Sequence, residues 1–262
     1  MAIGDDRGQW FLVNASPDLP AQIRAFAELQ PQPGALRGTP LAGILLTNAD
    51  LDHVLGLLLL REGGRLHVYA TNTVRQTLDG SIGLTPLLDA FCGVTWHPPS
   101  ENDFAPLEGE GGKSSVVCRA IGLPGKPPLF ANGKRLGEKH SIAYQFMDHR
   151  TSRKLLVAPD VAECNAALSA ALQESDAVLF DGTFWSGNEL SRVKARARTA
   201  SDMGHLTIKD DSLALLGELR GQRKVYIHIN NTNPVLCSGS PEQAAVAAAG
   251  IEVGYDGLEF EL

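Results

Sequence analysis

One short segment of the chain combines several side chains that can bind a metal. It reads TNADLDH (residues 47–53) and directly follows an apolar run. Asp52 and His53 hold the places of the last two ligands in an H-x-H-x-D-H metal motif, while Asn48 and Asp50 stand where its two leading histidines would be. Exchanging imidazoles for oxygen donors moves the metal preference away from zinc and towards iron or manganese.

Ionisable residues also end or interrupt three later apolar runs. Asp160 follows KLLVAP, Asp181 lies within AVLFDG, and His228 lies within KVYIHIN. Charges at the ends of buried strands are costly unless they are paired or bound to a metal. We therefore predict that these residues and the 47–53 segment converge on one metal site at the edge of a sheet.

Each candidate residue also has an ordinary structural interpretation. Asp52 suits the start of a helix, where a carboxylate caps backbone N–H groups. Asp160, which follows a proline, and Asp181 both suit simple turns. His228, taken alone, would be a histidine satisfied within the core. His205 follows a Met-Gly pair and fits a turn beside a solvated helix face.

The stretch before His205 is unusually basic. It contains Arg192, Lys194, Arg196 and Arg198. Such a run can attract a substrate that carries carboxylates, which arginine binds with two parallel hydrogen bonds. Histidine has a pKa suited to acid–base work. The functional interpretation is therefore substrate binding by Arg196 and Arg198, with His205 as a ligand or an acid–base group.

The elements that must position these residues alternate between apolar runs and helix-like stretches, which favours a layered α/β organisation. The sequence predicts strands at residues 10–15, 41–47, 65–70, 114–120, 141–147, 154–159, 177–182 and 224–230. It predicts helices at residues 17–29, 52–61, 162–173, 210–219 and 240–249. We expect one domain over residues 1–262.

Composition excludes several classes of protein. With 262 residues and 44% hydrophobic side chains, the chain can bury a substantial core. Its 23 basic and 30 acidic residues give a net charge of -7, which argues against a nucleic-acid partner. An apolar window of about 20 residues, as a membrane span needs, is lacking. The N-terminus opens with two acidic residues and lacks the basic and then apolar order of a secretory signal peptide. We therefore expect a cytoplasmic protein without membrane insertion.

Several motifs together resemble one family. TNADLDH, LPGKPPLF, LFDGTFW, MGHLTI and IHINNTNP resemble the PqqB family, metallo-β-lactamase-fold proteins of pyrroloquinoline quinone (PQQ) biosynthesis, from about Trp10 to the C-terminus. The resemblance implies an α/β, metallo-β-lactamase-like αββα sandwich with two mixed sheets. The family usually begins with a glycine-rich strand and a C-x-C-x-x-C zinc clip, and this chain begins after both. Either the start codon is misassigned, or this is an N-terminally shortened domain whose first sheet has lost its leading strands. We expect the chain as given to be less soluble, or more prone to oligomerise, than an extended version.

The resemblance also implies a set of metal ligands. It makes Asp52, His53 and His228 the chief ligands of one ion, with Asp50 and Asp160 as further ligands. Two imidazoles and one carboxylate are the donor set of non-haem Fe(II) oxygenases. We expect Fe(II) in this site, with zinc or manganese as alternatives.

The implied function is a step in PQQ biosynthesis, the oxidative hydroxylation of the tyrosine ring in a cross-linked Glu-Tyr intermediate. Asp181 would serve catalysis beside the ion, and Asn48 and Asn230 would contact this diamino-acid or quinone precursor. Other proteins of the PQQ pathway are candidate partners.

Two alternatives remain open. The first is a non-catalytic carrier that helps to transport PQQ or its precursor to the periplasm. The second is a dinuclear zinc hydrolase or phosphodiesterase. Against the hydrolase, residues 123–126 read LPGK where hydrolytic relatives place another zinc-binding histidine.

Overall fold

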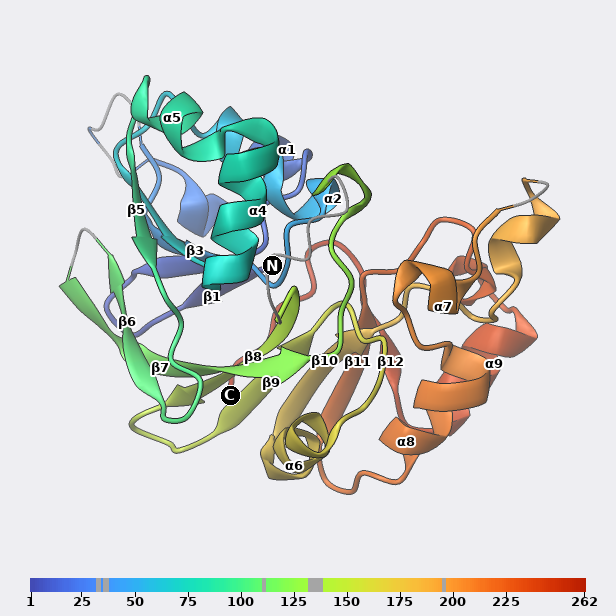
Figure 1. Ribbon diagram of the computed structural model, residues 1–262. Helices are drawn as coiled ribbons and strands as arrows, with labels where there is room; N and C mark the ends of the chain where they lie inside the picture. The colour runs from blue at the N-terminus through green and yellow to red at the C-terminus, as the bar shows by residue number, and fades with distance from the viewer. Residues whose placement is uncertain (32–33, 35–37, 110–111, 132–138, 195–196) are drawn as a thin grey trace. The chain divides into compact units, whose positions relative to one another are not determined.

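The computed structural model describes residues 1–31, 34, 38–109, 112–131, 139–194 and 197–262 (Figure 1). It contains two compact units, which are described separately below. The N-terminal unit comprises residues 1–119 and 126–140, and the C-terminal unit comprises residues 120–125 and 141–262. The expectation of a single domain stays a prediction.

The N-terminal unit contains a five-stranded mixed sheet of order β1-β2-β3-β4-β5. The strands are β1 (Ala2–Gly4), β2 (Trp10–Val13), β3 (Leu41–Leu45), β4 (Leu66–Tyr69) and β5 (Val94–His97). All neighbours are parallel except β1 and β2. Side chains alternate between the two faces of each strand, so Leu12, Ile44 and Val68 share a face and pack in one core cluster.

Short helices cover that face of the first sheet, because their buried leucine and valine side chains belong to the same cluster. They are α1 (Leu19–Ala25), η1 (Ala27–Leu29), α2 (Leu51–Val54), α3 (Gly56–Leu59), α4 (Asn72–Ile82) and α5 (Leu84–Asp89). Strands β6 (Ala105–Gly109) and β7 (Gly112–Leu123) pair antiparallel, and η2 (Leu129–Ala131) follows. Thr71 caps α4, and Gly83 ends it with a φ of 63°.

The C-terminal unit contains strands in the order β12-β11-β10-β9-β8, again with mixed directions. They are β8 (Ser141–Asp148), β9 (Lys154–Ala158), β10 (Ala177–Asp181), β11 (Arg223–Ile227) and β12 (Glu252–Val253). Neighbours from β9 to β12 are parallel, whereas β8 is antiparallel to β9. Parallel neighbours end at the same edge of the sheet, which is what allows β9, β10 and β11 to supply one site.

The C-terminal unit also contains helices, several of which pack apolar side chains on these strands. They are α6 (Ala166–Glu174), η3 (Glu189–Arg192), α7 (Ala200–Met203), the π-helix η4 (Ile208–Ser212), α8 (Leu213–Gly217), η5 (Pro234–Leu236) and α9 (Pro241–Ala248). Leu168 of α6, Leu216 of α8 and Val246 of α9 join Phe180 and Tyr226 of the sheet in one core cluster. No helix among the described residues is long and apolar enough to cross a membrane.

The predicted strands all occur, and the prediction of two mixed sheets is confirmed. Four predicted helices differ. The helix expected over 17–29 is α1 followed by the 3-10 turn η1, with Phe26 extended between them. The helix expected over 52–61 is two short helices joined at Leu55, and the helix expected over 210–219 begins as a π-helix at Ile208. The helix expected from residue 162 starts at Ala166, because Asn165 caps it by accepting the Leu168 N–H. Among the described elements, the sequence did not predict α4, α5, α7, β1, β5, β6 or β12, nor the 3-10 turns η2, η3 and η5.

Gly56 allows α3 to lie against the chain that follows β2. A Cβ atom at this position would come 2.5 Å from the Ser16 carbonyl oxygen and 2.8 Å from that of Ala15. The Gly56 N–H donates to the Ala15 carbonyl, and the Ala15 N–H donates to the His53 carbonyl, at 2.9 and 2.7 Å. The close approach therefore also fixes the backbone of the 47–53 segment.

We predict that Gly56→Ala destabilises the protein by about 1–3 kcal/mol, because backbone atoms must move to admit the methyl group. Gly80→Ala is the matched control, since Gly80 is exposed within α4 and a Cβ there meets nothing within 4 Å. It should raise stability by up to about 1 kcal/mol through helix propensity. Urea unfolding of both variants measures the difference, and equal stabilities would contradict the packing argument.

Candidate metal centre

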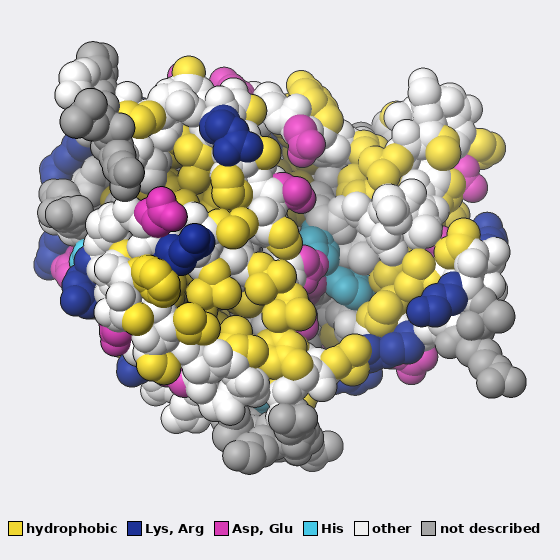
Figure 2. Space-filling model, turned by 90° about the horizontal axis from the view of Figure 1, so that it is seen from above, with side chains coloured by type: hydrophobic (Ala, Val, Ile, Leu, Met, Phe, Trp, Pro, Cys, Tyr) yellow, Lys and Arg dark blue, Asp and Glu magenta, His cyan; other side chains and the backbone are white. Residues whose placement is uncertain are grey.

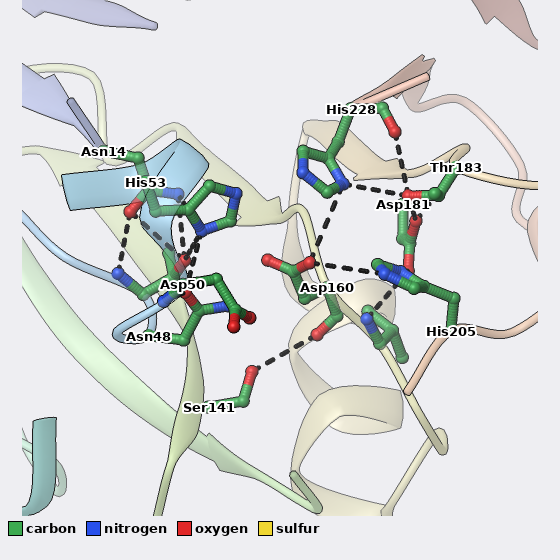
Figure 3. A network of polar contacts seen from close by, with 12 residues as sticks. Asn14, Asn48, Asp50, His53, Ser141, Asp160, Asp181, Thr183, His205 and His228 are labelled. Carbon is green, nitrogen blue, oxygen red and sulfur yellow. Dashed lines mark hydrogen bonds and ion pairs between the residues drawn. The ribbon is translucent and has the colours of Figure 1, made fainter. Parts of the chain in front are cut away.

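Three parallel strands of the C-terminal unit end in the predicted ionisable residues. Asp181 is the last residue of β10, where it pairs in register with Ile227 of β11. His228 follows Ile227 directly, and Asp160 follows β9 after one proline. The edge expected from the sequence therefore exists within this unit (Figure 3).

Asp160, His205 and His228 form a cluster that can hold a metal ion. One ligand atom from each lies within 4.8 Å of the other two. Asp160 Oδ1 is 3.7 Å from His205 Nε2 and 3.7 Å from His228 Nδ1. The two imidazole rings are stacked with centroids 5.7 Å apart. Their side chains are 11% and 24% exposed, so the cluster is partly shielded and still reachable from solvent. Histidine and acidic side chains lie next to one another at the surface in Figure 2.

Asp181 holds the ring of His205 and does not face the cluster itself. Asp181 is 1% exposed, and its Oδ2 accepts hydrogen bonds from His205 Nδ1 at 2.8 Å and from the Val161 N–H at 2.9 Å. Its Oδ1 accepts the N–H and the hydroxyl of Thr183 at 3.0 and 2.7 Å. Because a carboxylate only accepts, His205 carries its proton on Nδ1 and keeps the Nε2 lone pair for a metal.

His228 has a left-handed backbone, which turns the chain sharply at the end of β11. Its φ is 56°, a region that histidine enters more readily than most residues. Thr183 Oγ1 lies 2.8 Å from both His228 Nδ1 and the His228 carbonyl oxygen. When the Thr183 hydroxyl proton points to the charged Asp181, the stronger acceptor, His228 must donate from Nδ1. Nδ1, the His228 nitrogen that lies 3.7 Å from Asp160 Oδ1, then carries the proton, and Nε2 carries the lone pair.

The pKa of His205 is raised from 6.5 by its acidic neighbours. Burial is the largest single effect and would lower the pKa. The hydrogen bond to Asp181, together with the charges of Asp181 and Asp160, outweighs burial, while His228 acts in the opposite direction. A metal must therefore displace a proton that the metal-free site holds more firmly than an ordinary histidine does.

The 47–53 segment forms a separate polar cluster in the N-terminal unit (Figure 3). Asp50 takes the N-cap position of α2 without a side-chain capping bond, and Asp52 lies exposed in its first turn. His53 is 4% exposed, and its Nδ1 lies 2.9 Å from Asn48 Oδ1. Asn48 therefore fixes this ring as Asp181 fixes His205, leaving Nε2 as the candidate ligand atom.

The predicted site residues thus fall in both units. The structure brings Asp160, His205 and His228 together, with Asp181 behind them. The shared ion expected from Asp52, His53 and His228, with Asp50 as a further ligand, joins residues of separate units and stays a prediction.

The predicted substrate contacts also stay predictions. Arg196 lies outside the described residues, and the exposed Arg198 donates to the Asp202 carbonyl. Asn48 is 6% exposed. The Asn230 N–H donates to the Thr183 carbonyl at 3.2 Å.

Three residues that position the candidate ligands were not predicted. Thr183 links Asp181 to His228, as described above. Asn14, with a φ of 60°, accepts the Thr47 N–H at its Oδ1 at 2.9 Å and so holds the start of the 47–53 segment. Asn233 is 1% exposed and donates to the Gly182 carbonyl at 2.9 Å. The signal available in the sequence was the type of residue, since asparagine tolerates left-handed backbone and threonine follows a turn-forming Asp-Gly pair.

Comparison with known proteins places this geometry in a family context. Residues 9–229 match the beta-lactamase superfamily domain. The chain is 38% identical to coenzyme PQQ synthesis protein B of Cupriavidus taiwanensis and 35% identical to that of Bradyrhizobium diazoefficiens. All of this chain is covered in both, with 86% and 87% of the relatives.

A crystal structure of Zn²⁺-bound PqqB from Methylobacterium extorquens superposes with a TM-score of 0.84 at 32% identity. This superposition covers all of this chain and 86% of the other. The prediction of an α/β metallo-β-lactamase fold is confirmed.

We predict that Asp181→Asn lowers the pKa of His205 and weakens metal binding about 10- to 100-fold, because the charged acceptor behind the ring is lost. In the metal-free wild type, the raised pKa means that protonated His205 stabilises the folded state fully at pH values below about 6.5, the ordinary pKa of histidine in the unfolded chain. This contribution is lost as the pH rises through the raised value. NMR titration of the imidazole and urea unfolding below and above that range measure both effects. An unchanged His205 titration would refute the role of Asp181.

Thr183→Val should also weaken metal binding, by about tenfold or more, because the side chain keeps its volume and loses the hydroxyl that orients His228. Thr183→Ser, which keeps the hydroxyl, is the matched control and should retain most of the affinity. Competition with a chelator of known affinity provides the measurement. Equal affinities of the two variants would show that the hydroxyl does not position the ligand.

Proposed function

Because this chain belongs to the coenzyme PQQ synthesis protein B family, we propose that it acts in PQQ biosynthesis as a metal-dependent oxidising enzyme. Its reaction is the hydroxylation of the tyrosine ring in a cross-linked Glu-Tyr intermediate. The observation that carries the proposal is the cluster of Asp160, His205 and His228, in which two imidazoles and a carboxylate surround one point. This donor set is that of mononuclear Fe(II) oxygenases.

The residues present fit a divalent transition-metal ion. Asp181 engages His205 Nδ1, so His205 Nε2 is oriented as a ligand beside Asp160 Oδ1. Thr183 holds the ring of His228, whose Nδ1 lies 3.7 Å from the same carboxylate oxygen. Fe(II), when bound, supplies coordination positions at which dioxygen and substrate can meet. Zinc or manganese fits the same donors, and zinc is the ion named for the Methylobacterium extorquens protein.

The chain's own residues hold the ligands and manage their protons. Asp181 keeps a proton on His205 Nδ1 and balances the charge of a bound cation. Thr183 fixes the His228 ring, and Asp160 supplies the anionic ligand. We further propose that Asp52 and His53 contribute to the same ion, and that Arg198 and Asn230 contact the carboxylates of the diamino acid.

The decisive experiment is purification without oxygen, followed by elemental analysis and assay of the Glu-Tyr-derived diamino acid with Fe(II) or Zn²⁺ added. With a two-electron reductant such as ascorbate present, we expect Fe(II)-dependent oxygen uptake. One oxygen atom of dioxygen enters the ring, giving a product one oxygen atom heavier, and the other leaves as water. Asp160→Asn and His228→Ala should lose at least about 100-fold in kcat/KM, a range that covers removal of a ligand. His149→Ala, an exposed histidine in a turn, is the control and should retain full activity.

Other outcomes distinguish the alternatives. Tight binding of PQQ without turnover would favour the carrier function over the enzyme. Zn²⁺-dependent cleavage of phosphodiesters would favour the hydrolase over the oxygenase. His53→Ala with full metal content would remove the 47–53 segment from the ligand set. We propose that the protein acts in the cytoplasm with other PQQ-pathway proteins as candidate partners. The proposed function requires neither a membrane nor a nucleic acid.

A further inference from the structure

Two histidines of the N-terminal unit form a pair that the proposed oxidation does not use. His67 lies in β4 and His97 in β5, on adjacent parallel strands at the edge of the first sheet. His67 Nδ1 is 3.0 Å from His97 Nε2, and the rings are stacked with an interplanar angle of 18°. Both side chains are half-buried, so the pair is held in place and remains accessible from solvent.

The separation of these two nitrogens is close to that of two ligands on one ion. Zinc binds imidazole nitrogen at about 2.0–2.1 Å, so two ligands in a tetrahedral arrangement lie roughly 3.3 Å apart. A small rotation of the rings would direct both lone pairs to one point. We propose that His67 and His97 form a second site for a divalent transition-metal ion, independent of Asp160, His205 and His228.

The protonation of the pair suits metal binding. The hydrogen bond between two imidazoles requires one nitrogen with a proton and one with a lone pair. Burial lowers the pKa of His97, and His67 lowers it further, against an opposing effect of Glu108. Neutral imidazole is the form that binds metals. The bridging proton can move to the other nitrogen of its own ring, so an ion binds to two neutral histidines without net proton release.

The surroundings make the pair more than a chance contact between surface side chains. The ring of Tyr69 stacks on His97 with centroids 4.7 Å apart, and Tyr69 is 6% exposed. Its hydroxyl donates to the Glu108 carbonyl at 3.0 Å and accepts the Glu108 N–H. The charge of the Glu108 carboxylate acts on His97, whose pKa it tends to raise, and Lys113 Nζ lies 3.6 Å from this half-exposed carboxylate.

The test titrates the metal-stripped full chain with Zn²⁺ while the histidine ring resonances are followed by NMR. His67→Phe and His97→Phe, which keep aromatic packing, assign the two resonances. We expect both rings to respond to zinc in the wild type and in His228→Ala alike. His97→Phe should bind one zinc ion fewer by elemental analysis. His67→Phe should lower the zinc affinity of this site more than about tenfold, because losing a ligand lowers the affinity more than losing a residue that only orients a ligand.

Controls separate the pair from other histidines and from folding. His149→Ala should bind as many zinc ions as the wild type, and Glu108→Gln should weaken the second site less than either histidine variant does. Zinc should raise the Tm of His228→Ala and should not raise that of His97→Phe in the same background. The proposal fails if the His67 and His97 resonances stay unchanged during the titration. It also fails if His97→Phe and the wild type bind equal numbers of ions. The wild-type spectrum decides even if a phenylalanine variant folds poorly.

Discussion

The buried carboxylate of Asp181 sets the geometry of the C-terminal cluster. A charge taken out of water costs several kcal/mol unless hydrogen bonds replace its hydration. Asp181 accepts from the Val161 N–H, from both the N–H and the hydroxyl of Thr183, and from the His205 ring. These partners come from the ends of neighbouring strands and from the turn after α7. The hydrogen bonds that satisfy the Asp181 charge therefore also fix the loops that carry the candidate ligands. If the His205 ring shifts, the buried Asp181 carboxylate loses one of its donors.

Much of this arrangement follows from patterns within the sequence. Apolar runs of β-branched and leucine residues predict the strands, and parallel strands bring Asp160, Asp181 and His228 to one edge. The role of His205 was harder to predict, because it comes from a turn after the short helix α7 and reaches Asp181 across 24 residues. Only the folded chain shows that Asp181 accepts the Nδ1 proton of the His205 ring. The same residue also forms the turn with Thr183 that its sequence context suggested.

Other parts of the structure have no sequence pattern strong enough to predict them. Helix α4 is rich in threonine and other polar residues, and its identity depends on the Thr71 cap, the Gly83 terminus and packing on the sheet. Asn48 matched a ligand position of the metal motif, yet its amide oxygen contacts His53 Nδ1. A motif fixes the place of a side chain along the chain, whereas the choice between binding an ion and orienting a neighbour depends on rotamers and on tertiary partners.

The left-handed backbone of His228 has a consequence for the evolution of this chain. A side chain in that region costs about 1 kcal/mol relative to glycine, and the ring of His228 is held by Thr183 Oγ1 at 2.8 Å from Nδ1. Selection for folding alone would favour glycine or asparagine at this position. A histidine at this position therefore stores a backbone cost that only a role for its imidazole would offset. If the proposed ion were dispensable, glycine at position 228 would relieve this cost and the fold would become more stable, so stability and the proposed ligand place opposite demands on one residue.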